Sequence, residues 1–157
     1  MVFTCLQATY VGLPNFNSER ACLLLVIIGC GVAKRSGVHK AADLYTSGYF
    51  RLKLAYARTI TDDDSILILS GKYGFTRLDQ EIASYDQHIS ENGAISDSTL
   101  KQQARGIKVR GGDVIVLGGK DYVERIRPLW VDCKTPLSGG LPQQMKWLKA
   151  QVEGDTG

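Results

Sequence analysis

Three short apolar runs that end at or next to a glycine constrain the fold of this chain more than any other feature. They span residues 23–28, 66–70 and 113–117, and each is rich in Ile, Leu or Val. Runs of this length and composition are typical of parallel strands that are buried on both faces of a sheet. We therefore predict three parallel strands, connected by right-handed crossovers through helices.

The segments between these runs have the spacing of amphipathic helices. Residues 43–60 are predicted to form the first helix with its lead-in, and Thr46 or Ser47 can cap it. A short fourth strand is predicted at residues 133–136. Three further helices are predicted to begin near Ser96, Lys120 and Pro142. This alternation predicts an α/β fold, a three-layer sandwich with a mostly parallel four-stranded central sheet.

Length and composition favour one ordinary globular domain. The chain has 157 residues, of which 44% are hydrophobic and 22% are charged. This length suits one domain with its own core and is short for two. We predict a leader or edge extension at residues 1–22, a single α/β domain at 23–152 and a frayed tail at 153–157.

The charged residues and cysteines narrow the class of protein. A net charge of +3 is compatible with a nucleic-acid or phosphate partner but does not identify one. The four cysteines are scattered, without a C-x-x-C pair or a His at metal-ligand spacing. We therefore expect no metal site and no disulfide framework, and a reducing cytoplasmic location.

Residues 23–30 superficially resemble the hydrophobic region and cleavage box of a bacterial lipoprotein signal. No positively charged segment opens the chain, however, as such a signal requires. The run is also too short to cross a bilayer as a helix. We interpret it as the first buried strand and expect no membrane partner.

Each of the three strands is followed by a glycine and then, at once or a few residues later, by a lysine. The pairs are Gly31 with Lys34, Gly71 with Lys72 and Gly119 with Lys120. The carboxyl ends of parallel strands share one edge of the sheet, where α/β proteins bind ligands. We predict that the three ammonium groups converge there on an anionic or carbonyl-rich ligand. Neither a Walker loop nor a G-x-G-x-x-G fingerprint is present, so no such cofactor is implied.

Aromatic and acidic side chains accompany these strand ends. Tyr45, Tyr73, Tyr85 and Tyr122 are predicted to lie where they could stack on a base, or alternatively to close the core. Asp43 and Asp86 are the candidate catalytic carboxylates, with helix or turn capping as the alternative. Cys30 is interpreted as a buried structural cysteine, and His88 as a further candidate acid or base.

The order and spacing of these residues, from about residue 23 to residue 149, resemble a small phage and bacterial domain family of unknown function. That family is often found near nucleic-acid modification genes. The matching series is Cys30-Gly31 with Lys34, residues 42–47 with Phe50, residues 68–75 with Tyr85-Asp86, Gly119-Lys120 with Tyr122, and residues 136–139 with Trp147-Leu148. The predicted substrate-binding residues are Cys30, Gly31, Lys34, Tyr45, Ser70, Lys72, Tyr73, Gly74, Tyr85, Lys120, Tyr122 and Ser138.

More distantly, the S-G-K-Y-G turn at residues 70–74 resembles the peroxide-stress DNA-binding protein family and an accessory domain of archaeosine synthases. The layout is similar to a uracil-DNA-glycosylase-like or flavodoxin-like fold. The glycosylase resemblance implies a flipped base and cleavage of an N-glycosidic bond. The chain nevertheless has Gly29-Cys30-Gly31 where that superfamily has a G-Q-D-P-Y-type loop, and residues 135–138 where it has an H-P-S loop.

Two classes of function follow from these observations. The leading hypothesis is an enzyme that modifies or excises a base in DNA or RNA, with Asp86 or Asp43 as the acid–base or charge-stabilising group. The alternative is a non-catalytic module that binds nucleic acid or a nucleotide, including a regulator that sequesters a small nucleotide. Neither hypothesis requires a cofactor.

Overall fold

The computed structural model describes residues 24–109 and 111–154, so the predicted leader and the last three residues of the predicted tail lie outside the described part. The chain has a mixed α/β fold built on a sheet with the strand order β4-β3-β1-β6. β1 (Leu25–Gly29) pairs in parallel with β3 (Ile66–Ser70) and with β6 (Val114–Leu117). The mostly parallel four-stranded sheet is thus confirmed.

The fourth strand of the sheet is not the one that we predicted. It is β4 (Gly74–Arg77), which returns antiparallel to β3, whereas residues 133–136 contribute one parallel bridge, between Lys134 and Ile115. Gly74 has a φ of 76°, a conformation that other residues rarely adopt, and it turns the chain back after Tyr73. An antiparallel neighbour needs only this tight turn, so no helix separates β3 from β4.

The first predicted helix is two helices. α3 (Ala41–Leu44) ends at Tyr45, whose backbone is extended, and α4 (Gly48–Ile60) begins after Ser47. The Ser47 hydroxyl accepts the backbone N–H of Phe50 at 3.1 Å, which confirms one of the two predicted caps. The remaining helices confirm the prediction and are α5 (Asp97–Ala104), α6 (Lys120–Ile126) and α7 (Leu141–Gly154).

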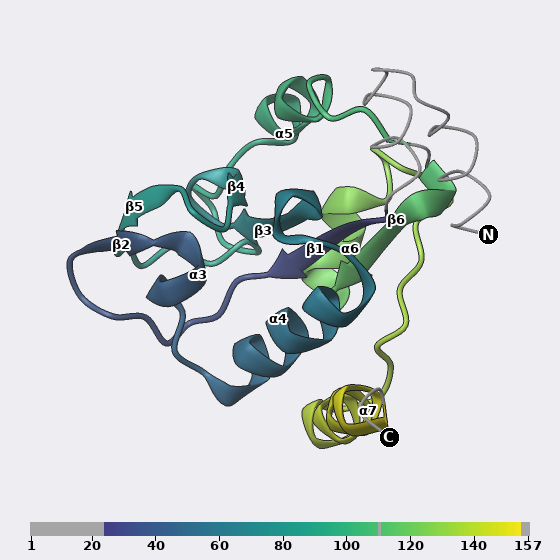
Figure 1. Ribbon diagram of the computed structural model, residues 1–157. Helices are drawn as coiled ribbons and strands as arrows, with labels where there is room; N and C mark the ends of the chain where they lie inside the picture. Colours follow the sequence, from purple (N-terminus) through teal and green to yellow (C-terminus); the bar gives the residue numbers. More distant parts are fainter. Residues whose placement is uncertain (1–23, 110, 155–157) are drawn as a thin grey trace, which may run out of the picture.

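A second, smaller sheet was not predicted. β2 (Val38–Lys40) and β5 (Glu81–Ala83) pair antiparallel and lie with α3 beyond the carboxyl ends of β1 and β3 (Figure 1). Single 3₁₀ turns at Asp63–Ser65 and Gly111–Asp113 lead into β3 and β6. Both small strands are short and mostly exposed, so they lack the apolar runs that indicate a buried strand.

Helices cover the central sheet from opposite sides. α4 packs against β1 and carries α7 on its outer side, where the Tyr56 and Trp147 rings meet edge to face at 5.2 Å. α5 contacts β4 and lies at the opposite side of the sheet in Figure 1. Val26, Ile27 and Ile28 of β1 are completely buried, as the continuous apolar run predicts for a central strand. Among the described residues, no helix combines the length and apolarity needed to cross a membrane.

Candidate functional site

A cluster of hydroxyl groups lies at the carboxyl end of β3. Ser70 is fully buried, and its Oγ accepts the backbone N–H groups of Lys72 at 3.1 Å and Tyr73 at 3.0 Å. The same hydroxyl donates to the Tyr85 hydroxyl at 2.8 Å, which in turn lies 2.7 Å from the Tyr45 hydroxyl. Ser70 therefore fixes the S-G-K-Y-G turn and anchors two phenols beside it.

Two predicted lysines lie against the tyrosines of this cluster. The Nζ atom of Lys34, beyond β1, is 4.4 Å from the ring centroid of Tyr85 and 5.8 Å from that of Tyr45. The Nζ atom of Lys72, beyond β3, is 5.2 Å from the ring centroid of Tyr73. The Tyr73 and Tyr85 rings meet edge to face with centroids 5.5 Å apart. The structure thus brings Lys34 and Lys72 to one pair of tyrosines.

Beyond the third parallel strand, β6, it is Tyr122 rather than Lys120 that contacts the end of β1. Lys120 is largely exposed and forms an ion pair with Glu124 at 3.7 Å; no contact in the described part of the chain joins it to the tyrosines. Tyr122 is buried, donates its hydroxyl to the backbone oxygen of Cys30 at 2.8 Å and lies 3.4 Å from the Cys30 Sγ. A Cβ at Gly29 would lie 2.8 Å from the Tyr122 ring, so this glycine permits the close packing.

Burial keeps these phenols protonated. Desolvation, followed by the nearby Cys30 thiol, raises the pKa of Tyr45, Tyr85 and Tyr122 far above its ordinary value of 10.0. Cys30 itself is buried, as we interpreted it. At neutral pH the cluster therefore offers neutral O–H donors rather than phenolates.

The candidate carboxylates have no partner among the described residues. Asp43 lies in α3 and Asp86 directly follows Tyr85, and both are exposed. In residues 24–109 and 111–154, neither carboxylate forms a hydrogen bond or an ion pair. Ser138 is exposed in the segment that leads to α7, and Gly31 is partly buried next to Cys30. Asp86 is adjacent in sequence to the hydroxyl cluster, and its side chain is accessible to a ligand.

The segment that carries Tyr85, Asp86 and His88 is folded onto the end of β3. The backbone N–H of Ile95 donates to Gly71 O at 2.8 Å, and a Cβ at Gly71 would lie 2.2 Å from Gln87 O. His88 contacts the Ser90 hydroxyl through Nδ1 at 2.8 Å, and its ring centroid lies 6.1 Å from that of Tyr122. Residues 85–88 are thus held against the strand ends.

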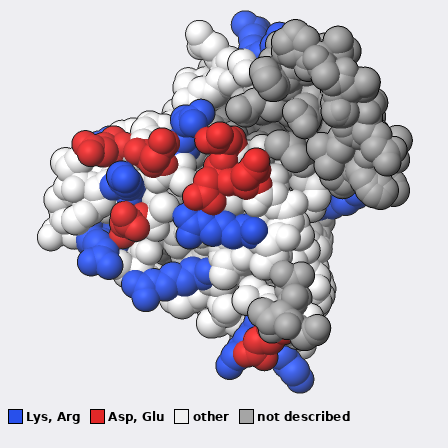
Figure 2. Space-filling view, in the orientation of Figure 1, with Lys and Arg blue, Asp and Glu red and all other residues white. Residues whose placement is uncertain are grey.

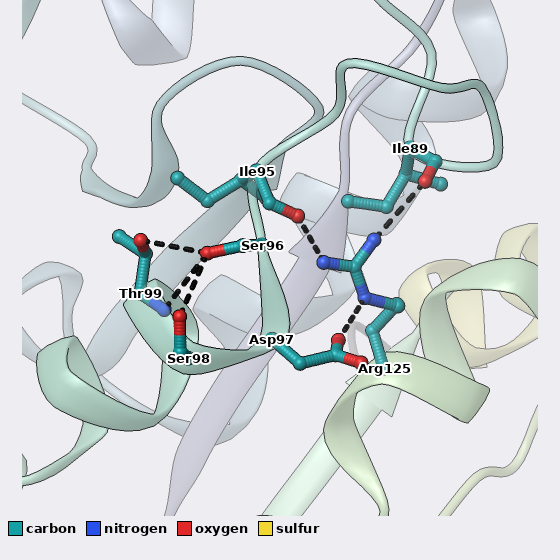
Figure 3. A network of polar contacts seen from close by, with 7 residues as sticks. All are labelled: Ile89, Ile95, Ser96, Asp97, Ser98, Thr99 and Arg125. Carbon is teal, nitrogen blue, oxygen red and sulfur yellow. Dashed lines mark hydrogen bonds and ion pairs between the residues drawn. The ribbon is translucent and has the colours of Figure 1, made fainter.

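Arg125 ties this segment to α5 and α6 (Figure 3). Its Nε donates to Asp97 Oδ1 at 2.6 Å, while its Nη atoms donate to the backbone oxygens of Ile89, at 3.1 Å, and Ile95. Its side chain is 19% exposed, and that of Asp97 is 84% exposed. Nothing in the sequence pattern singled out Arg125, because an arginine in an amphipathic helix is usually solvated.

Lys53 and Gln103 are two further residues that the sequence pattern did not identify. Lys53 of α4 is 2% exposed; its Nζ donates to Gly29 O at 2.9 Å and lies 4.1 Å from the Tyr49 ring centroid. Desolvation lowers the pKa of Lys53 to about 8. Gln103 of α5 accepts from Phe75 N at 2.9 Å and donates to Tyr73 O at 3.1 Å, and so fixes the turn at Gly74.

Charged side chains of both signs occur on the one face of the molecule that Figure 2 shows. On the face shown in Figure 2, basic and acidic side chains are interspersed and form no broad patch of one sign. The described residues contain no group of His, Cys, Asp and Glu side chains that could hold a metal ion. The arrangement is therefore one of local cations and neutral phenols at the strand ends.

Comparison with known proteins identifies the family of the chain. Residues 25–150 match a family of unknown function (DUF6884), and the chain belongs to that family. No curated protein and no solved structure matches the chain.

Proposed function

We propose that the chain binds a nucleotide unit of DNA or RNA at the carboxyl ends of β1 and β3 and acts on the base at its N-glycosidic bond. The observation that carries this proposal is the placement of the Lys34 and Lys72 ammonium groups against the rings of Tyr85 and Tyr73. Ammonium groups attract phosphates, and a tyrosine ring offers a base a surface on which to stack. The phosphate and the base of a nucleotide thus each have a complementary group in this cluster.

Asp86 is the residue that we assign to the chemistry. Hydrolysis breaks the bond between the sugar C1′ and the base, and the electron pair of that bond leaves with the base. A water molecule adds its oxygen to C1′, and its proton passes by way of the Asp86 carboxylate to the departing base. The carboxylate also stabilises the positive charge that develops on the sugar. Its exposed position next to Tyr85, where no described residue binds the carboxylate, is compatible with this role.

The resemblance of the strand-end residues to families linked to nucleic-acid modification supports the same proposal. A mostly parallel sheet with a ligand at the carboxyl ends of its strands is common to uracil-DNA-glycosylase-like and flavodoxin-like folds. We propose the former for this chain because the implied substrate is a base that has been flipped out of the stack. The interspersed charges of the face in Figure 2 give that face no broad basic surface for a long duplex.

A second candidate is a non-catalytic module that binds a nucleotide or nucleic acid. One observation favours it: no neighbouring group in the described part of the chain holds the carboxylate of Asp86 or Asp43 in place. Catalytic carboxylates are usually oriented by a hydrogen bond. This module would use the same lysines and tyrosines and release no product.

Incubation of the pure protein with DNA that contains canonical or hypermodified bases, followed by mass spectrometry of the released bases, separates the two candidates. The enzyme is expected to release one base, and Asp86→Asn should reduce the rate by about 100-fold or more while the fold is retained. Asp132→Asn changes another exposed aspartate and is the matched control. Unchanged turnover in Asp86→Asn would remove this residue from the mechanism, and binding without any released base would favour the module.

A further inference from the structure

The hydroxyl cluster of Ser70, Tyr85 and Tyr45 has three O–H protons but only two hydrogen bonds between its members. The Ser70 Oγ already accepts two backbone N–H groups, which occupy its two lone pairs. Ser70 must therefore donate its own proton, and it does so to the Tyr85 hydroxyl. The direction of this first hydrogen bond is fixed by the turn.

The second hydrogen bond, between the phenols of Tyr85 and Tyr45, uses one proton whichever residue donates. If Tyr85 donates, the proton of Tyr45 is left over; if Tyr45 donates, the proton of Tyr85 is left over. The hydroxyl of Tyr45 also interacts with the Ser70 side chain, whose two lone pairs are already occupied, so in the described residues neither phenol gains a further acceptor. One phenolic O–H of this pair is thus a donor without an acceptor in the protein.

We infer that this surplus phenolic O–H is the group that recognises the base, by donating to an uncharged acceptor such as a carbonyl oxygen or a ring nitrogen. This inference rests on the proposed function and deepens it, because it names the kind of atom that the ligand must present. This donor is only partly buried and lacks an acceptor in the described residues, so a ligand that supplies one gains affinity. A ligand whose base has no acceptor at that point should bind more weakly.

Three features of the site support this role. The contact between the Tyr45 and Tyr85 hydroxyls is only partly buried, so the spare proton is not sealed inside the core. Desolvation raises the pKa of both phenols, and they therefore remain donors at physiological pH. The Lys34 ammonium lies near both rings, so a phosphate held by it would place the rest of a nucleotide beside the two hydroxyls.

The proton count makes an unusual prediction for phenylalanine variants. Tyr45→Phe leaves the proton of Tyr85 spare, and Tyr85→Phe leaves the proton of Tyr45 spare, so each single variant keeps a phenolic donor. The double variant keeps no phenolic donor, and its one spare O–H is that of Ser70, which is fully buried. We expect each single variant to lose about threefold or less in affinity for a nucleotide, and the double variant about tenfold more than either.

The experiment is a calorimetric titration with the four deoxynucleoside 5′-monophosphates and with deoxyribose 5-phosphate, which has no base. The double variant should lose affinity for the tightest-binding nucleotide and none for deoxyribose 5-phosphate. Tyr56→Phe removes the same atom from a tyrosine that packs on Trp147 of α7, and it should bind as the wild type does. Equal nucleotide binding by the double variant and the wild type overturns the inference and leaves the proposed function standing.

Raman spectra of the wild type give a second test that does not depend on the folding of any variant. The tyrosine Fermi doublet reports hydrogen bonding by phenols, and it should change on addition of the nucleotide but not of deoxyribose 5-phosphate. A doublet that is unchanged by bound nucleotide contradicts the inference. If the wild type binds none of the nucleotides, the proposed function fails, and the inference fails with it.

Discussion

The Nζ atom of Lys34 lies 4.4 Å from the ring centroid of Tyr85, and this contact joins the end of β1 to the segment that follows β5. Neither residue belongs to a regular strand or helix of the structure. Their position depends on Ser70, which anchors the Tyr85 hydroxyl, and on the bridge between Lys34 and Tyr45. The candidate site is thus assembled from loops that are fixed by strand ends.

Lys34→Gln is expected to weaken the binding of single-stranded DNA and to make it less sensitive to salt. Each phosphate contact contributes about 0.7 to the slope of log K against log salt for a single strand, so the slope should fall by about that amount. Lys149→Gln removes the same charge from an exposed position on α7 and should leave the slope unchanged. Equal slopes for the wild type and Lys34→Gln would exclude Lys34 from phosphate binding.

Gly71→Ala should destabilise the fold by about 2 kcal/mol or more, because the new methyl group would lie 2.2 Å from the backbone oxygen of Gln87. Gly119→Ala, at the end of another strand, has nothing within 4 Å of the added Cβ and should change the free energy of unfolding by about 0.5 kcal/mol or less. Urea denaturation of both variants measures the difference. Similar stabilities would mean that residues 87–89 do not rest on Gly71.

In the wild type, we expect the buried Lys53 to make the free energy of unfolding increase with pH, and Lys53→Met should abolish this increase. Because burial lowers the pKa of Lys53 to about 8 from 10.5, the unfolded chain binds more protons than the folded one between these values. The free energy of unfolding of the wild type should therefore increase across this window, by at most about 3 kcal/mol from this group. Above the ordinary tyrosine pKa of 10.0 the buried phenols act in the opposite direction, since the folded state then binds more protons.

The difference between the wild type and Lys53→Met, measured by urea unfolding at pH values between about 7 and 10, isolates the contribution of the lysine. Parallel curves for the two proteins would show that the ammonium is not desolvated in the folded state.

Arg125→Met should loosen the segment between Tyr85 and α5. The substitution leaves the backbone oxygens of Ile89 and Ile95 without their donor, which should cost about 1–3 kcal/mol. Hydrogen exchange at residues 87–95 should accelerate more than exchange in β1. Arg127→Met, at an exposed position just past α6, is the control and should affect neither quantity.

Buried strands were predictable from the sequence, whereas short exposed ones were not. β1, β3 and β6 follow the continuous apolar runs, and β3 has the predicted bounds, since a strand covered on both faces must be apolar throughout. β2 and β5 expose most of their side chains and have no such pattern. β4 was missed because its antiparallel return depends on one glycine turn rather than on a helix.

The candidate site, too, was predictable from the sequence only in part. The grouping of Lys34, Lys72, Tyr73 and Tyr85 follows from the rule that parallel strand ends share an edge. The separate position of Lys120 does not, because the helix that begins at this residue turns Tyr122 inward and leaves the lysine with Glu124. The roles of Lys53, Gln103 and Arg125 depend on which backbone oxygens or N–H groups lie within reach, and no sequence pattern records that.

The most direct measurement of the central claim is a map of amide chemical shifts during titration with deoxynucleoside 5′-monophosphates. Binding at the carboxyl ends of β1 and β3 predicts that the shifted amides are those of residues 30–35, 70–74 and 84–88, while amides of α7 stay unchanged. Shifts confined to α7 or to the amino ends of the strands, or no shifts with any of the nucleotides, would contradict the account.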